Sequence, residues 1–190
     1  MPKSLSAAFS VLFLLAIGQA QGGEIADAGL AAEKFAAESK YDEAFQALET
    51  ARDAIWNQSP LAFRKTLFVA SEPQGFGLFD IRESDAFKRS EPLVIYTEPV
   101  GFAYGRDGQM FITDLALDFE VFDASGASIA AQENFGSWTL RSRVANKEFM
   151  GKLDYDFSGL EPGDYEVVTT VRDKNSDKKA SFGMKFKLLP

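Results

Sequence analysis

The chain has 190 residues, of which 46% are hydrophobic and 25% charged, and its formal net charge at pH 7 is −8. This acidic balance argues against nucleic acids as partners, because phosphate binding requires a basic surface. The sequence contains neither histidine nor cysteine, which excludes imidazole catalysis, thiol nucleophiles, disulfides and the usual zinc and copper sites, and leaves carboxylate, lysine and tyrosine chemistry and oxygen-ligated calcium or magnesium.

Residues 1–20 have the pattern of a secretory signal peptide. Lys3 precedes a mostly apolar run over residues 5–17, and Gly18 and Ala20 place small side chains at the two positions that a signal peptidase reads. The run is shorter than the ~20 apolar residues of a spanning helix, although an uncleaved membrane anchor is the alternative. Cleavage predicts a bacterial periplasmic or secreted protein with no membrane insertion, and the absence of cysteine excludes a lipid anchor at the cleavage point.

Residues 21–59 are predicted to form an antiparallel helical hairpin. The segment is rich in alanine, glutamate and leucine, which are good helix formers. Its apolar side chains over residues 35–55 recur at spacings of three and four. The polar stretch 38–42 interrupts this pattern, with Asp42 as a candidate cap of the second helix, and Pro60 ends the segment.

Part of this hairpin carries a set of residues spaced as in a known repeat: Tyr41, Glu43, Ala44, Leu48 and Ala51. Residues 31–51 thereby resemble one tetratricopeptide unit, with Ser39 at the position where that family usually has glycine. Such units stack in arrays of at least about three repeats, and the sequence contains no second copy. We therefore expect the hairpin to cover part of the following domain, and a peptide-binding surface is the alternative.

The hydrophobic period changes to two in the third predicted region, residues 60–190. Turn residues separate the alternating stretches at Asp107-Gly108, Ser125-Gly126 and Pro162-Gly163. Many short strands without intervening helices predict an antiparallel β-sandwich. The predicted strands are residues 61–70, 93–98, 111–123, 137–143, 148–157, 164–173 and 180–188.

The turn formed by Leu160, Pro162 and Gly163 leads into a strand that has Tyr165 near its start. This turn and strand are similar to those of fibronectin type III and bacterial immunoglobulin-like domains, over about residues 93–190. The resemblance implies an immunoglobulin-like sandwich in which Tyr165 folds back to hydrogen-bond the upstream backbone, with Pro162 and Gly163 as structural residues. It implies nothing about function, because this fold hosts many activities.

The loop between the last two predicted strands contains Asp173, Asn175 and Asp177, which have the spacing that opens an EF-hand. An EF-hand also requires glycine at its sixth position and a bidentate acid at its twelfth, where this sequence has Lys178 and Met184. We therefore predict a hairpin loop with no metal, and no cofactor elsewhere in the chain.

The candidate contact residues are aromatic and cationic. Phe102 and Tyr104 lie in a glycine-containing segment without a clear strand pattern, and aromatic side chains on loops can stack on a sugar or grip a protein. Trp138 precedes Arg141 and Arg143, which share one strand face and could meet an acidic partner or polysaccharide. The alternatives are that the aromatic residues fill the end of the core and that the cations prevent pairing at a strand edge.

Two carboxylate pairs, Asp118 with Glu120 and Asp154 with Asp156, each share a predicted strand face. A glycosidase needs two carboxyl groups about 5–9 Å apart, one of them with a raised pKa. Because both pairs alternate with core residues, we expect them to point into water.

The sequence therefore predicts a non-catalytic binding or assembly module of the bacterial envelope, with an envelope protein or a polysaccharide as its partner. One alternative is a carbohydrate-binding or carboxylate-dependent carbohydrate-active protein that uses Asp154, Asp156, Phe102 and Tyr104. The other alternative is a structural subunit of an envelope complex.

Overall fold

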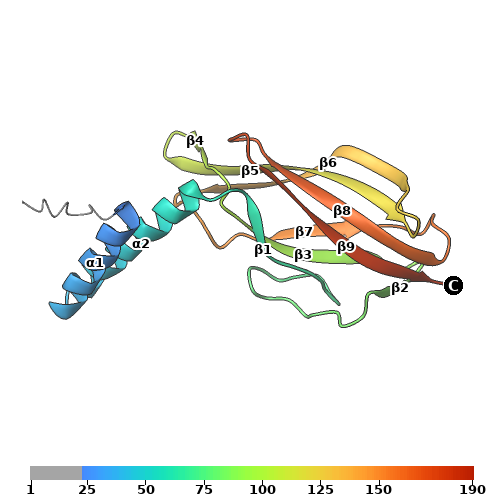
Figure 1. Cartoon of the computed structure of the whole chain (residues 1–190), viewed down its shortest axis with the longest axis horizontal. Coiled ribbons are helices and arrows are strands. Elements are labelled where there is room, and N and C mark those ends of the chain that lie inside the picture. Colours follow the sequence, from blue (N-terminus) through green and yellow to red (C-terminus); the bar gives the residue numbers. More distant parts are fainter. Residues whose placement is uncertain (1–22) are drawn as a thin grey trace, which may run out of the picture. The chain divides into compact units, whose positions relative to one another are not determined.

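The structure is a computed structural model that describes residues 23–190. The predicted signal peptide, residues 1–20, lies outside the described residues. Helices α1 (Glu24–Ala37) and α2 (Tyr41–Gln58) precede nine strands in two sheets within the described chain (Figure 1). The prediction of a mainly β protein with an N-terminal helical pair is confirmed at this level.

The described chain divides into two compact units, and the division lies inside α2. The first unit includes the described residues up to Ala51, and the second is Arg52–Pro190. The boundary expected from the sequence lies after residue 59. The last turns of α2 belong to the second unit because Ala54 and Trp56 are buried there and Trp56 joins its hydrophobic core.

The first unit is a helical hairpin whose turn is closed by Ser39. The amide of Lys40 donates to the carbonyl of Phe35 at 2.9 Å, and Ser39 adopts a left-handed φ of 59°, as is common just after a helix. Helix α2 begins at Tyr41, so Asp42 lies inside the first turn and is not the N-cap. Among residues 23–190, no helix has the length and apolar character needed to cross a membrane.

The smaller sheet is antiparallel and has the order β1 (Ala62–Phe68), β3 (Leu93–Val100), β7 (Gly151–Tyr155). Both faces of β3 are covered. Ile95 points into the main core, whereas the Tyr96 hydroxyl on the opposite face accepts a hydrogen bond from the Gly77 amide at 2.8 Å. The segment between β1 and β3 therefore folds over the outer face of this sheet.

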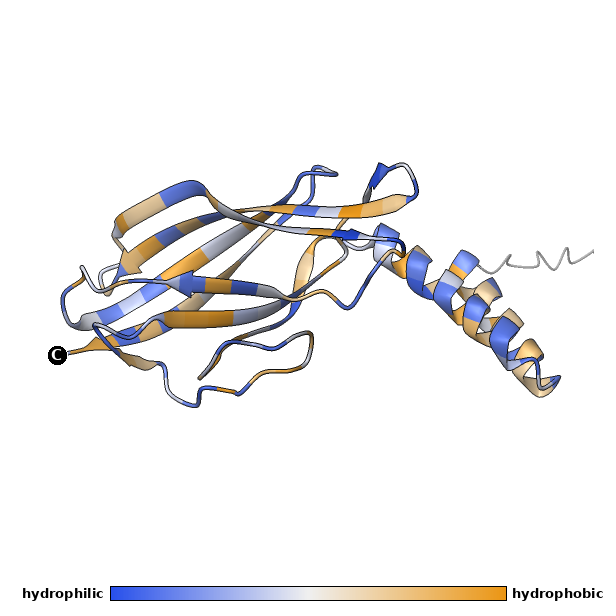
Figure 2. Ribbon diagram, turned by 180° about the vertical axis from the view of Figure 1, so that it is seen from behind, coloured by the Kyte–Doolittle hydropathy of each residue, from blue (hydrophilic) through white to orange (hydrophobic). Residues whose placement is uncertain are grey.

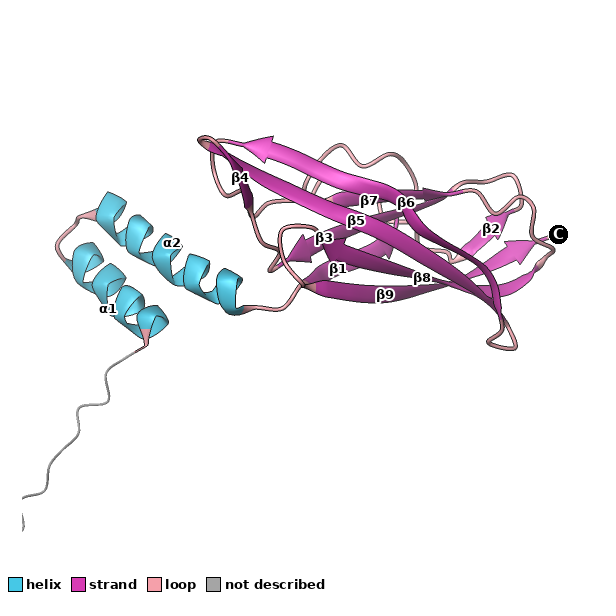
Figure 3. Ribbon diagram, turned by 90° about the horizontal axis from the view of Figure 1, so that it is seen from above, coloured by secondary structure: helices cyan, strands magenta, loops and turns pink. Residues whose placement is uncertain are grey.

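The larger sheet has the order β2, β9, β8, β5, β4. Strand β6 lies outside this order and pairs with β5 over most of its length. The long strands of this sheet are strongly twisted, so that the sheet curls (Figure 3). The strand bounds are β2 (Ala86–Lys88), β4 (Gly105–Asp107), β5 (Met110–Asp123), β6 (Ser128–Ser142), β8 (Gly163–Asp173) and β9 (Lys179–Leu189).

One strand pairing corrects the prediction of a wholly antiparallel fold. Strand β2 pairs with β9 in parallel, with Phe87 opposite Leu188. Only three residues form β2, and the fully buried ring of Phe87 holds it to the core. Such a short strand between charged residues shows no period of two, so the sequence pattern could not reveal it.

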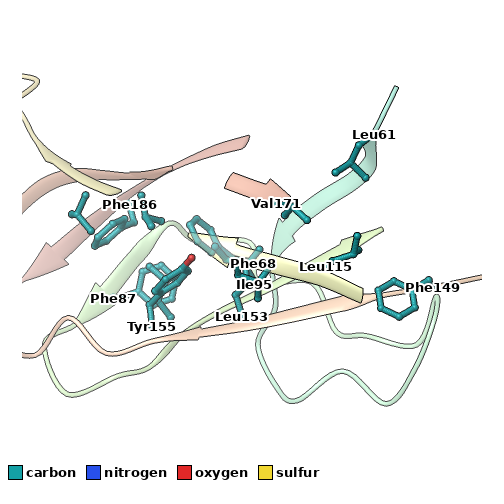
Figure 4. Close-up of a cluster of buried hydrophobic side chains, with 14 of the residues drawn as sticks. Leu61, Phe68, Phe87, Ile95, Leu115, Phe149, Leu153, Tyr155, Val171 and Phe186 are labelled. Carbon is teal, nitrogen blue, oxygen red and sulfur yellow. The ribbon is translucent and has the colours of Figure 1, made fainter. Parts of the chain in front are cut away.

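Both sheets contribute to one hydrophobic core, as the close-up in Figure 4 shows. Hydrophobic and hydrophilic residues alternate along many of the strands (Figure 2), which places one side chain in two toward this core. Fully or almost fully buried members include Leu93, Ile95 and Leu153 from the smaller sheet and Leu115, Val121, Val167 and Val171 from the larger one.

Candidate functional site

The predicted contact residues Phe102 and Tyr104 lie in the short connection between β3 and β4. Gly101 begins this connection with a φ of +76°, a left-handed conformation that favours glycine. A Cβ atom at this position would also collide with the carbonyl oxygen of Pro60. The connection therefore packs directly against the chain that leaves α2.

A buried carboxylate holds the same connection from the other side. Asp173 is 4% exposed, and its Oδ2 accepts hydrogen bonds from the Ala103 amide at 2.7 Å and from the Ser176 hydroxyl at 2.6 Å. Its Oδ1 accepts a third hydrogen bond from the Asn175 amide at 3.0 Å. Because burying a carboxylate is costly without donors, these bonds fix the connection to the β8–β9 loop.

Two more side chains of the β8–β9 loop reinforce this attachment. The Lys178 ammonium donates to the carbonyl oxygens of Gly101 at 2.7 Å and of Asn57 at 3.4 Å. The Asn175 amide group donates to the Ile112 carbonyl at 2.9 Å. The loop thus joins the end of α2, the β3–β4 connection and β5 through polar contacts.

The loop itself is the predicted hairpin, since β8 and β9 pair up to Arg172 with Lys179. The side chains of Asp173 and Asn175, which have EF-hand-like spacing, bind backbone and hydroxyl groups of this protein. Within residues 23–190, no three acidic side chains gather closely enough to hold a metal ion.

Beside this connection lies a cleft of about 440 Å³, which we call the aromatic cleft. Its ring-bearing walls come from the last turns of α2, from the β3–β4 connection and from the start of β5. All of its lining residues belong to the second unit. Those that carry rings or charges are Asp53, Trp56, Tyr104, Arg106, Phe111 and Lys147.

The rings of the aromatic cleft are fixed by one another and by hydrogen bonds. The Trp56 indole N–H donates to the Phe102 carbonyl at 2.7 Å, and the ring centroids of Trp56 and Tyr104 lie 6.4 Å apart in nearly parallel planes. The Tyr104 hydroxyl donates to the Asn146 carbonyl at 2.9 Å. Burial, together with the nearby Asp53 carboxylate, raises the pKa of Tyr104, so its phenol stays protonated and a donor.

Two cations border these rings. The guanidinium carbon of Arg106 lies 3.4 Å from the centroid of the Phe111 ring. The Lys147 ammonium forms an ion pair with Asp53 and lies 5.9 Å from the Trp56 ring. Because Asp53 offsets the charge of Lys147, the cleft has a net positive charge from Arg106, which is exposed. An arrangement of this kind can bind a flat apolar group next to an anionic one.

Comparisons with known proteins add little to this geometry. No family is shown. No family model and no curated protein matches the chain. Alkylpurine DNA glycosylase AlkC from Pseudomonas fluorescens, bound to DNA, is 10% identical with a TM-score of 0.37, and the match covers 80% of this chain and 39% of that one.

Two further solved structures are similarly distant. The sporulation control protein Spo0M from Bacillus subtilis is 12% identical with a TM-score of 0.34, over 70% of this chain and 50% of that one. The PmoD soluble domain from a Methylocystis species is 9% identical with a TM-score of 0.29, over 70% of this chain and 99% of that one. None of these likenesses is close enough to carry an argument about fold or function.

The structure divides the predicted site residues between different places. Tyr104 lines the aromatic cleft, whereas Phe102 is 0% exposed and lies beneath Trp56, with ring centroids 5.0 Å apart. Phe102 is therefore a core residue that supports the cleft wall and is not available for contact. This outcome corresponds to the alternative in which aromatic residues fill the end of the core.

Trp138, Arg141 and Arg143 do not line the aromatic cleft. The Trp138 indole N–H donates to the Lys152 carbonyl at 3.0 Å, and its ring lies so close to the β7 backbone that Gly151 has no room for a Cβ atom. Arg141 pairs with Asp107 at 2.5 Å, and Arg143 is exposed in the bend after β6.

The side chain of Tyr165 contacts the backbone upstream of it. Its hydroxyl donates to the Glu161 carbonyl at 2.8 Å, four residues upstream, and its ring stacks on Phe186. Pro162 lies between Glu161 and Tyr165 in the sequence, and Gly163 begins β8.

One carboxyl group of each predicted pair has hydrogen-bond donors that lower its pKa. The Arg172 guanidinium donates to both oxygens of Asp118, at 2.7 and 3.0 Å, and lowers the pKa of that carboxyl. Asp156 lies after the end of β7 and not on the strand, and its hydrogen bond from the Ser158 amide lowers its pKa. Since a general acid needs a raised pKa, neither side chain suits that role at neutral pH.

Proposed function

We propose that this chain is a non-catalytic binding or assembly module of the bacterial envelope and that it binds its ligand in the aromatic cleft. The observation that carries the proposal is the cleft itself, in which fixed rings and an exposed guanidinium lie side by side. The lack of histidine and cysteine supports a role without catalysis. The signal-peptide pattern of residues 1–20 supports export to the periplasm or the medium.

We also propose that the second unit is an immunoglobulin-like β-sandwich. The shared core of the two sheets supports this assignment, as does the hydrogen bond from Tyr165 to the Glu161 carbonyl. The parallel pairing of β2 with β9 departs from the wholly antiparallel form of that fold. For the first unit, the spacing of residues 31–51 supports a single tetratricopeptide-like hairpin.

The chemistry of the aromatic cleft indicates which ligands to test first. The partly exposed ring of Tyr104, supported by the buried Trp56, suits the apolar face of a sugar or an aromatic side chain, and Arg106 suits a carboxylate or phosphate. An acidic polysaccharide and an acidic segment of an envelope protein both combine these groups. In either case the exposed guanidinium of Arg106 supplies the charged contact.

The test is an Arg106→Ala variant, with Arg143→Ala as its matched control. Both arginines are exposed, but only Arg106 lines the aromatic cleft. Purified protein would be screened on a glycan array and by pull-down from an envelope fraction. We expect Arg106→Ala to weaken binding of the captured ligand by about tenfold or more, because a charge-assisted hydrogen bond is lost, and Arg143→Ala to bind as the wild type does.

Loss of binding in Arg143→Ala alone would place the ligand on the bend after β6 and contradict the proposal. Failure to capture any glycan or protein would leave the chain without a binding partner and would also contradict it. Turnover of a glycan by the purified protein would contradict the non-catalytic role.

A carbohydrate-binding protein is the second candidate function. The partly exposed ring of Tyr104, which the buried Trp56 ring supports at an interplanar angle of 20°, favours it because flat aromatic surfaces stack on sugar faces. Binding of a neutral glycan that survives Arg106→Ala but is lost in Phe111→Ala would support this candidate over recognition of an acidic partner.

A further inference from the structure

The helical hairpin has an open apolar groove that the aromatic cleft does not include. The groove measures about 740 Å³, and both α1 and α2 line it over residues 26–48. We call it the hairpin groove. Its large apolar side chains remain exposed by 65, 60, 67 and 52%, respectively, in Leu30, Tyr41, Phe45 and Leu48.

These side chains stay exposed because α1 and α2 meet through small residues. The buried residues of the hairpin before Ala51 are alanines: Ala28, Ala32 and Ala44. Close approach through alanine leaves no depth in which a leucine or phenylalanine side chain could be buried. A contiguous exposed apolar patch of this kind marks an interaction surface.

The spacing of the groove residues suits a helix as the occupant. In α2, Tyr41, Phe45 and Leu48 are four and three residues apart, and Leu30 and Glu33 of α1 are separated by three. This spacing aligns each set on one side of its helix, parallel to the helix axis. A third helix can lie between two such rows and insert its own apolar side chains at intervals of three and four residues.

The charge around the groove selects between possible occupants. Residues 24–51 contain seven acidic and two basic side chains, a net charge of −5. Glu33 lines the groove, and Asp27 and Asp42 each lie three residues before a groove residue, Leu30 and Phe45, so they flank it. A second copy of the hairpin would bring another net charge of −5 to the same interface, whereas a basic partner would meet opposite charges.

We propose that the hairpin groove docks a basic amphipathic helix of a partner protein. Apolar side chains of that helix contact Leu30, Phe45 and Leu48, and its lysine or arginine side chains face Asp27 and Asp42. The proposal goes beyond the aromatic cleft and does not depend on the function proposed for it, because the two surfaces belong to different units.

The probe is a synthetic amphipathic peptide of about 18 residues, made of leucine and lysine at helical spacing. One control peptide has the same composition in scrambled order, and a second has glutamate in place of lysine. Binding to the purified protein would be measured by isothermal titration calorimetry. We expect the leucine–lysine peptide to bind at least about tenfold more tightly than either control, because only that peptide combines the apolar face with the positive charge.

Variants of the protein locate the site. Phe45→Ala removes the most exposed groove side chain, and Leu78→Ala removes a comparably exposed one, 61%, from the second unit. We expect Phe45→Ala to weaken peptide binding about tenfold and Leu78→Ala to leave it unchanged. Circular dichroism of both variants establishes that the helices remain folded.

Four outcomes would overturn the proposal. Equal binding of the scrambled or the glutamate peptide would show that the apolar face or the charge is irrelevant. Equal effects of Phe45→Ala and Leu78→Ala would place the peptide elsewhere. Sedimentation showing a dimer that Phe45→Ala dissociates would make a second copy the occupant. Markedly tighter peptide binding after removal of residues 1–20 would make that segment the occupant.

Discussion

Asp173 is the residue on which the geometry of the candidate site most depends. Its buried carboxylate accepts hydrogen bonds from three groups and holds the β3–β4 connection that carries Phe102 and Tyr104. Asp173 is also one of the acidic residues that have EF-hand-like spacing. A pattern that suggests a metal ligand thus has a structural role in positioning a ring of the aromatic cleft.

Replacement of Asp173 by alanine is expected to lower the free energy of unfolding by about 2–3 kcal/mol. The change leaves the part-buried Ala103 amide without its acceptor and removes charge-assisted hydrogen bonds. Urea denaturation measures the effect, and Asp177→Ala in the exposed part of the same loop is the matched control. Equal losses in the two variants would show that the buried carboxylate does not hold the connection.

Only part of the aromatic cleft could be predicted from individual residues. The sequence predicts Tyr104 as a contact residue because it is an aromatic residue in an irregular, glycine-containing segment. Trp56 could not be predicted as a cleft residue, because its place in a helical pattern indicates only a buried helix face. The cleft forms because Trp56 meets Tyr104, which lies 48 positions later in the sequence. Phe111 lies at the start of a predicted strand and Arg106 lies beside a predicted turn, so neither position indicates a binding site in the sequence.

At the scale of elements, the backbone of the turn in the helical hairpin is slightly strained at Ser39. Ser39 has a φ of 59°, and a left-handed conformation is unfavourable for a residue with a Cβ atom. Glycine usually occupies the corresponding position in the repeat that residues 31–51 resemble.

Ser39→Gly is therefore expected to stabilise the hairpin by about 0.5–1 kcal/mol, the strain relief being partly offset by the greater freedom of glycine in the unfolded chain. Thermal unfolding followed by helical circular dichroism checks this. Ser59→Gly is the control, because Ser59 bonds the Ile55 carbonyl at 2.7 Å and its loss should not stabilise. A lower melting temperature for Ser39→Gly would contradict the account of the turn.

The elements that the sequence could predict are those with one buried face. Strands β8 and β9 alternate in burial over most of their length, and their positions follow from the hydrophobic period of two. Strand β5 also follows from this period, although Leu115, Ala116 and Leu117 are all buried. The first half of β6 is exposed on both faces, so residues 128–134 lack an alternating hydrophobic pattern and the sequence predicts only the later part of this strand. Asn134, with a φ of 51°, lies where the β5–β6 register shifts.

At the scale of the whole molecule, the two units carry surfaces of opposite chemistry. The aromatic cleft combines rings with an exposed guanidinium, whereas the hairpin groove combines aliphatic and aromatic side chains with an acidic surround. One ligand cannot satisfy both sets of charges equally well. The proposed role is therefore that of a module with two separate contacts, in keeping with assembly in the envelope.

Ligands are proposed to enter the aromatic cleft, and the two tryptophans of the chain allow a direct measurement of this. Trp56 lines the cleft, and Trp138 bonds the Lys152 carbonyl outside it. In two-dimensional NMR spectra, titration with the captured glycan or envelope protein should shift the indole N–H signal of Trp56 until saturation and leave that of Trp138 unchanged. A saturable shift of the Trp138 signal with no change at Trp56 would contradict the account.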